Sequence, residues 1–362
     1  MKKPTLFQRN TNTIVLSLLL LASSQTVFAN PYSSTHTVVL KDGTSLDIVI
    51  ANSPPAPPQQ KLAAKGLVSA VPKTGDVKLS NVPAYIWSYG PAATAGAMIA
   101  GYYDRTGFAN MYTGPTNGGV MPLTNTSWGA SDKGGNECPL SATRQGVDGR
   151  ATRGHVDDYY VHQGDSGPDP YVVNGWTEHT PGECVGDYMK ASKWFPNSST
   201  EHPTIFPENI NKDGAATFLF SVAGDPVTAP YLEQQGYAQY DAGYGLKLFF
   251  ESRGYKVSTM YNQYINPLKY YGFTYDQYKA EINAGRPVML HLSGHIVVGI
   301  GYNTSTNNEI IFHDSWDEYE HTMEWGGDYS VGLATYTHNA VTIVTLKKFP
   351  WPLFLPAINR PR

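Results

Sequence analysis

The amino-acid sequence predicts an α+β fold, in which a helix-led half is followed by a strand-led half. Residues 92–103 are almost all small or apolar, which favours a helix that packs closely on every side. After residue 286, runs of apolar and β-branched residues alternate with turn residues, as in an antiparallel sheet. We therefore expect a buried helix early in the domain and an antiparallel sheet after it.

The first 29 residues have the pattern of a secretory signal peptide. Basic residues at positions 2, 3 and 9 precede a short apolar run at 14–22, and small residues precede an expected cut before Asn30. The run is too short to span a bilayer, so a membrane anchor is the weaker alternative. We expect a secreted protein, extracellular or periplasmic, with no membrane span.

The charge of the chain gives no electrostatic basis for binding nucleic acid. Loss of the three basic residues with the signal peptide takes the net charge from -4 to -7. A nucleic-acid-binding surface needs clustered Lys and Arg, which this composition does not favour. We therefore expect no nucleic-acid partner.

The mature chain divides into an N-terminal piece at 30–75, a main domain at 76–348 and a tail at 349–362. Within the N-terminal piece, residues 38–40 and 46–50 favour two strands around a turn. A proline-rich spacer follows at 52–58. This pattern fits a propeptide, a packing strand pair or a surface-docking arm, and the sequence does not choose among them.

The main domain opens with the helix, for which Pro91 suits the first position because the missing N–H would be unpaired there. Residues 106–200 are rich in Gly, Asn, Asp and Pro and predict long loops, used for binding or as a lid. Helix caps and runs of apolar residues predict the later helices and strands. They are a helix at 240–253 ended by Gly254, a strand at 255–260, a helix capped by Thr274 and Gln277 and ended by Gly285, and strands at 287–292, 295–302, 309–313 and 341–346.

His295 and Asp314 are the candidate residues for chemistry. The linker 303–308 has turn composition, so the strands on either side of it are expected to form a hairpin. Reflected through the centre of that turn, His295 falls opposite Trp316, two positions past Asp314. An imidazole and a carboxylate at one end of a hairpin suit a histidine that a carboxylate orients.

Several motifs resemble the bacteriocin-processing, papain-like cysteine peptidase family, over roughly residues 79–346. In that family a Cys-Gly-Pro-type helix start is followed by Met seven residues on and by Tyr-Tyr eleven and twelve residues on. The matching residues in this chain are Met98, Tyr102 and Tyr103, then Gly285-Arg286-Pro287-Val288, Gly294-His295 and Asp314-Ser315-Trp316. The segments 110–123, 153–158 and 184–189 resemble an exported bacterial branch of the same family. The resemblance implies a papain-like fold with the histidine and aspartate on the sheet.

The same resemblance places Pro91, and not cysteine, at the nucleophile position. Counting back seven residues from Met98, or eleven from Tyr102, reaches residue 91 both times. A rival register, which aligns Gly90-Pro91 with the family's Gly-Pro, places Tyr89 there instead. Proline has neither a nucleophilic atom nor a backbone N–H for an oxyanion. We therefore expect a pseudo-peptidase that binds a peptide or protein ligand and needs no cofactor, with catalytic positions Pro91 (inactive), His295 and Asp314.

Three other groups of residues raise the question of a disulfide or a metal site. Cys138 and Cys184 are compatible with a disulfide in an exported protein, or with a free thiol. The acids and histidine at 155–169 suit either a solvated loop or a Ca²⁺ site, although they have no EF-hand spacing. The spacing of His291, His313 and His321 fits no zinc signature, so we expect no metal.

Two alternative functions remain open from the sequence. An active hydrolase would use another nucleophile near His295, for which Ser88, Thr94 and Ser293 are the candidates. A surface or adhesion module would use the N-terminal piece, the spacer and the aromatic tail for tethering.

Overall fold

A computed structural model describes residues 32–53, 73–88, 90–112, 119–125, 184–191, 214–306 and 308–347. Its helices are α1 (Pro91–Arg105), α3 (Val185–Met189), α4 (Ala229–Gln235), the 3₁₀ helix η3 (Ala238–Tyr240), α5 (Ala242–Ser252) and α6 (Tyr275–Asn283). Its strands are β1 (Ser33–Val39), β2 (Ser45–Ala51), β3 (Asp76–Lys78), β4 (Ala216–Ser221), β5 (Val227–Thr228), β6 (Val257–Tyr264), β7 (Val288–Leu292), β8 (His295–Asn303), β9 (Glu309–His313), β10 (His321–Glu324), β11 (Asp328–Val331) and β12 (Ala334–Leu346). The α+β class is confirmed.

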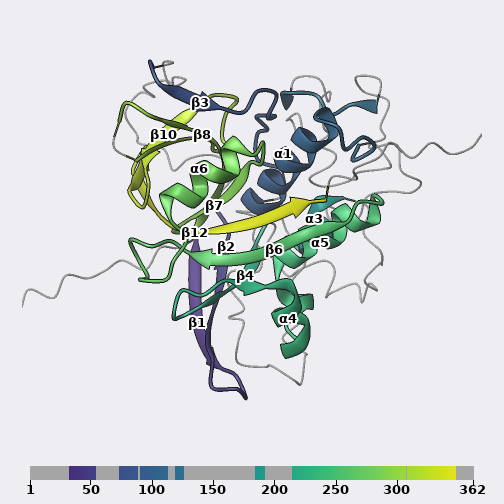
Figure 1. The fold of residues 1–362 in the computed structure, drawn as a ribbon, viewed down its shortest axis with the longest axis vertical. Helices are drawn as coiled ribbons and strands as arrows, with labels where there is room; N and C mark the ends of the chain where they lie inside the picture. Colours follow the sequence, from purple (N-terminus) through teal and green to yellow (C-terminus); the bar gives the residue numbers. More distant parts are fainter. Residues whose placement is uncertain are drawn as a thin grey trace, which may run out of the picture.

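The large sheet runs in the order β10-β9-β8-β7-β12-β6-β5, and neighbouring strands in this order are antiparallel. In addition, β3 pairs with β8 and β11 pairs with β12. Figure 1 shows α6 in front of β7 and β8, with α1, α3 and α5 gathered on the right. The sheet therefore lies between helices on both of its faces.

Side chains of β7 and β8 point alternately into two separate hydrophobic cores. Successive side chains of a strand point to opposite faces. Ile296 and Val298 of β8 pack into the core that contains α1 and α5, whereas Val297 packs into the core that contains α6. Because both faces are covered, every residue of β8 is buried.

The central helix α1 is buried along almost its whole length, as its composition predicts. All of its residues except Arg105 are buried. Small side chains permit this, because a Cβ at Gly96 would meet Met189 and one at Gly101 would meet Pro83. Pro91 occupies the first turn, in agreement with the position expected for a proline.

The N-terminal hairpin of β1 and β2 packs as part of the domain. Strand β2 pairs with β4 over six residues, which makes a three-stranded sheet in the order β1-β2-β4. Leu46, Ile48 and Ile50 of β2 are buried in the same core as α1. Figure 1 shows the hairpin (purple) extending away from the large sheet. In the structure, this piece is therefore a strand pair packed on the domain.

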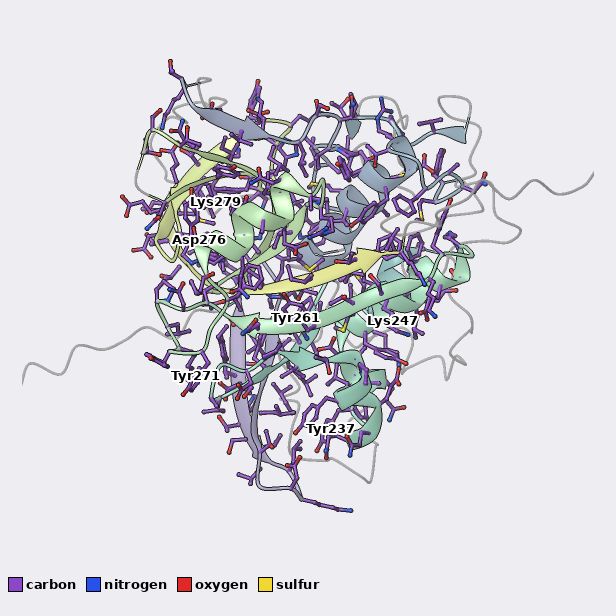
Figure 2. All side chains as sticks on the ribbon, in the orientation of Figure 1. Tyr237, Lys247, Tyr261, Tyr271, Asp276 and Lys279 are labelled. Carbon is purple, nitrogen blue, oxygen red and sulfur yellow. The ribbon has the colours of Figure 1, made fainter. Side chains whose placement is uncertain are left out.

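The helix caps follow the sequence closely. Thr274 and Gln277 form the expected capping box of α6, and Gly285 has φ 75 just after it. Asp276 and Lys279 form an ion pair of 2.8 Å on the outer face of α6, which Figure 2 labels.

Some elements were not predicted from the sequence: strands β3, β4, β5, β10 and β11 and helices α3, α4 and η3. They are short, between two and seven residues each. Among the described residues, no helix is long and apolar enough to cross a membrane.

Candidate functional site

The β8–β9 hairpin places His295 against Trp316, as the reflection through the turn predicts. Val298 pairs with His313 and Gly299 with Phe312, which is the register that puts position 295 opposite 316. The two rings stack in parallel, with centroids 3.9 Å apart and 6° between the planes. The indole therefore fixes the plane of the imidazole.

His295 contacts Asp314 through the main chain and not through the carboxylate. The Nε2 atom lies 2.6 Å from the carbonyl oxygen of Asp314. Because a carbonyl only accepts, Nε2 carries the proton of the neutral ring and Nδ1 is an acceptor. The expectation of an imidazole oriented by the Asp314 carboxylate is thus corrected: the residue orients the ring, but with its backbone.

The hydroxyl of Ser53 occupies the other side of the imidazole. Its Oγ lies 2.6 Å from Nδ1 of His295, close enough for the hydroxyl to donate its proton to that nitrogen. The Nε1–H of Trp87 donates to the carbonyl oxygen of Ser53 over 3.1 Å. Ser53 lies two residues past the end of β2, so the pairing of β2 with β4 places it here. Both ring nitrogens of His295 therefore have protein partners.

Burial makes His295 a weak base. Neither His295 nor Ser53 has exposed surface. Loss of solvation lowers the pKa of His295 to about 3, against a smaller opposing effect of the bond to Asp314. The imidazole is therefore neutral at physiological pH.

The Asp314 carboxylate is directed into its own turn. Oδ1 accepts the backbone N–H groups of Trp316 at 2.8 Å and Asp317 at 3.3 Å. Oδ2 accepts the hydroxyl of Tyr329 at 2.7 Å. Such a turn, in which an aspartate bonds its own following backbone, explains why the carboxylate does not reach His295.

A second histidine, His321, lies beside the carboxylates of Asp314 and Asp317. Its Nε2 lies 3.5 Å from Oδ2 of Asp314 and 3.0 Å from Oδ1 of Asp317. Burial opposes a charge on His321, yet the bond to Asp317 and the Asp314 carboxylate raise its pKa overall. Burial also raises the pKa of Asp314. These three residues have the donor types and the spacing for a metal ion. Their mutual contacts, however, already give both acids a partner within the protein.

The segment just before Pro91 contacts the turn that carries Asp314. The backbone N–H of Trp87, four residues earlier, donates to the carbonyl oxygen of Ser315 over 2.6 Å. This contact ties the start of the helix segment to the turn that carries Asp314. Pro91 is itself buried. Tyr89, the rival position for the nucleophile, lies outside the described residues.

The serine and threonine candidates from the sequence have structural partners. Thr94 Oγ1 accepts the N–H of Ser88 and donates to the Gly90 carbonyl at the start of α1. Ser293 Oγ accepts the N–H of Thr337 over 2.9 Å. The hydroxyl beside His295 is that of Ser53, which sequence reasoning missed. The two residues are 242 positions apart and share no local pattern.

The remaining candidates either have separate partners or lie outside the described residues. His291 Nε2 lies 2.7 Å from Thr342 Oγ1, and His313 Nδ1 lies 3.0 Å from the Pro83 carbonyl. Cys184 caps α3, where its sulfur accepts the N–H of Asp187. Cys138 and the acids at 155–169 lie outside the described residues, so the possible disulfide and the choice between a solvated loop and a Ca²⁺ site are not tested.

Comparison with known proteins finds one matching family model. Residues 191–337 match the model described as the Peptidase_C39 like family, a range that includes His295 and Asp314 and begins after α1. No curated protein and no solved structure matched the chain. This match supports a papain-like peptidase domain of the C39-like type over residues 191–337.

Proposed function

We propose that this chain is an exported peptidase-like protein that binds a peptide or protein ligand without cleaving it. The observation that carries the proposal is the environment of His295. Both of its ring nitrogens bond to protein atoms, and burial keeps the ring neutral. A histidine held in this way has no free nitrogen with which to activate a nucleophile other than Ser53.

The residue at the start of α1 supports the same conclusion. A papain-like peptidase takes its thiolate and one oxyanion donor from this position. Pro91 has no thiol and no backbone N–H, although it suits the first turn of a helix. The substitution therefore removes chemistry and leaves the helix intact.

Incubation of the full chain with a peptide library tests the proposal. We expect peptides to be retained without cleavage, detected by mass spectrometry of both the bound and the free fractions. Sustained cleavage that His295→Ala abolishes would show an active peptidase. Failure to retain any peptide would show that the ligand is not a peptide. Export is tested separately, by fractionation and by sequencing the N-terminus, which we expect to begin at Asn30.

The contact between Ser53 and His295 favours one alternative, a hydrolase with a serine nucleophile. A neutral imidazole that accepts the proton of a serine hydroxyl is the arrangement that activates serine in hydrolases. A fluorophosphonate probe separates the two functions. An active serine would be labelled in the native chain and not in Ser53→Ala. We expect no label at Ser53, because neither side chain of the pair is exposed.

A further inference from the structure

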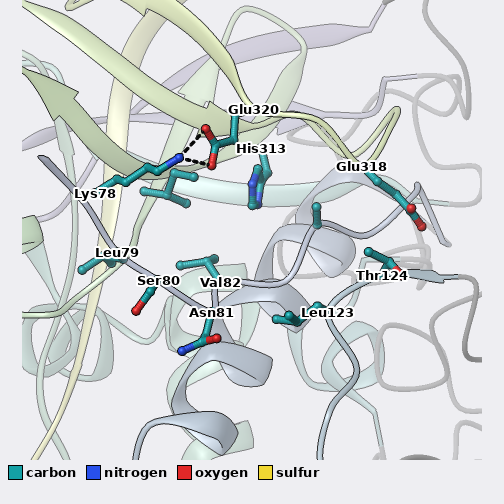
Figure 3. Close-up of a pocket in the computed structure, with 12 residues that line it drawn as sticks. Lys78, Leu79, Ser80, Asn81, Val82, Leu123, Thr124, His313, Glu318 and Glu320 are labelled. Carbon is teal, nitrogen blue, oxygen red and sulfur yellow. Dashed lines mark hydrogen bonds and ion pairs between the residues drawn. The ribbon is translucent and has the colours of Figure 1, made fainter. Parts of the chain in front are cut away.

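A cavity of about 410 Å³ lies between the segment 78–84 and the turn that follows β9. Small-molecule sites in proteins usually enclose roughly 300–1,000 Å³. The cavity is separate from the enclosed contact between His295 and Ser53, and His313, Glu318 and Glu320 line it. We call it the His313 pocket. Figure 3 shows the ring of His313 between the two glutamates, directed toward Val82.

His313 brings an unused hydrogen-bond acceptor to this pocket. Its Nδ1 lies 3.0 Å from the carbonyl oxygen of Pro83, which can only accept, so Nδ1 carries the proton. Nε2 is then an acceptor, and it has no hydrogen-bond partner among the described residues. The residue is only 6% exposed, and it lines the cavity. An unpartnered acceptor that opens onto a cavity can bind a ligand that donates to it.

The charged groups of the pocket leave one negative charge in excess. Both oxygens of Glu320 accept from Nζ of Lys78, at 2.7 and 2.8 Å, so this pair is neutral. Glu318 has no cation partner among the described residues. Its Oε1 accepts the N–H of Asn125 over 2.9 Å, which leaves Oε2 available. Burial lowers the pKa of His313 to about 4, so the imidazole adds no positive charge at neutral pH.

Apolar side chains complete the lining and define the rest of the ligand. Leu79, Val82, Leu123 and Ile300 line the same cavity. They suit a short aliphatic stem, as the methylene groups of Lys or Arg provide. A carboxylate or phosphate ligand would meet acceptors and a net negative charge, and is disfavoured.

We infer that the His313 pocket binds a primary amine or a guanidinium on a short aliphatic stem, such as the lysine or arginine side chain of a peptide. The cationic head donates to Nε2 of His313 and to the Glu318 carboxylate, and the stem lies on Val82 and Leu123. This inference rests on the proposed function, because it supplies the site and the residue type of the peptide ligand.

Titration calorimetry of the full chain with capped amino acids tests the inference. The probes are Nα-acetyl-lysine amide and Nα-acetyl-arginine amide, with Nα-acetyl-norleucine amide as the uncharged analogue of similar shape. A hydrogen bond to a charged group contributes about 1.5–3 kcal/mol, which is roughly a tenfold effect or more on Kd. We expect at least one basic probe to bind about tenfold more tightly than norleucine.

Two matched variants locate the binding. Glu318→Gln should remove most of the preference for the basic probe. Glu324→Gln, the same change at an exposed position on β10, should leave it intact. An NMR readout in the unchanged chain is independent of any variant: the lysine probe should shift the Nε2 resonance of His313.

The outcomes separate this inference from the proposed function. Equal affinity for lysine and norleucine probes, no binding of either, or a preference that survives Glu318→Gln would overturn the inference. If library peptides were still retained in those cases, the proposed function would stand with its ligand bound elsewhere. If the chain cleaved peptides while the basic preference depended on Glu318, the pocket would stand and the proposed function would fail.

Discussion

The hydroxyl of Ser53 lies 2.6 Å from Nδ1 of His295, although the two residues are 242 positions apart in the chain. The contact joins the end of the N-terminal hairpin to the start of β8. It gives the imidazole a donor on one nitrogen, while the carbonyl of Asp314 accepts from the other. The ring is thereby fixed in one tautomer inside the core.

Replacing Ser53 with alanine should destabilise the fold by about 1–3 kcal/mol, because it leaves a buried ring nitrogen without its partner. Urea unfolding followed by circular dichroism measures this change. Ser330→Ala, at an exposed position, is the matched control and should stay within about 0.5 kcal/mol of the unchanged chain. If the two variants were equally stable, the contact between Ser53 and His295 would carry no weight in the fold.

Asp314→Asn should change the titration of His321 and leave that of His295 as it is. The carboxylate of Asp314 raises the pKa of His321, so its loss should lower that pKa. His295 contacts only the main-chain carbonyl of residue 314, which asparagine retains. Histidine NMR titrations distinguish the two rings. A large shift in the His295 resonances would instead show that the carboxylate orients that ring.

Stability should fall with acid between pH 6.5 and about 3, partly because of His295. Its pKa is about 6.5 when exposed and about 3 in the fold, so the unfolded chain binds the extra proton in this window. The contribution of His295 to the free energy of unfolding is therefore complete above pH 6.5. It decreases as the pH falls, by up to about 1.4 kcal/mol per pH unit. Asp241 acts in the opposite sense, because burial raises its pKa to about 6.

The difference between two chains isolates the histidine. His295→Gln should have a shallower loss of unfolding free energy from pH 6.5 to pH 4 than the unchanged chain, because Asp241 contributes equally to both. Urea unfolding at several pH values gives this difference. Parallel pH profiles for the two chains would show that His295 does not titrate on unfolding in this range.

The parts of the fold that depend on local pattern could be predicted from the sequence. Turn composition and two-residue periodicity were enough to place His295 opposite Trp316, and the stacked rings agree. The capping box at Thr274 is equally local, since its bonds join residues three positions apart. In both cases the residues that interact are close in the chain or related by a single turn.

The contacts that define the site are not local, and the sequence could not predict them. Pairing of β2 with β4 joins segments about 170 residues apart, and it decides where Ser53 lies. The direction of the Asp314 carboxylate depends on backbone N–H groups at 316 and 317 and on Tyr329. Spacing alone identified the correct residue there but not the atom that contacts the imidazole.

Gly90→Ala, at the start of α1, should destabilise the fold by more than the cost of a strained backbone alone. Gly90 has φ 115, which disfavours any side chain, and a Cβ there would meet the backbone of Gly214 just before β4. Gly107 has a similar φ of 110 and open space around it. Gly107→Ala therefore reports the cost of the backbone conformation, about 1–3 kcal/mol. In Gly90→Ala, the new Cβ must also push the backbone of Gly90 away from that of Gly214. This variant should therefore unfold at a clearly lower urea concentration than Gly107→Ala. Equal midpoints for the two variants would mean that the approach of Gly90 to Gly214 can relax, and that the helix start is not held against β4.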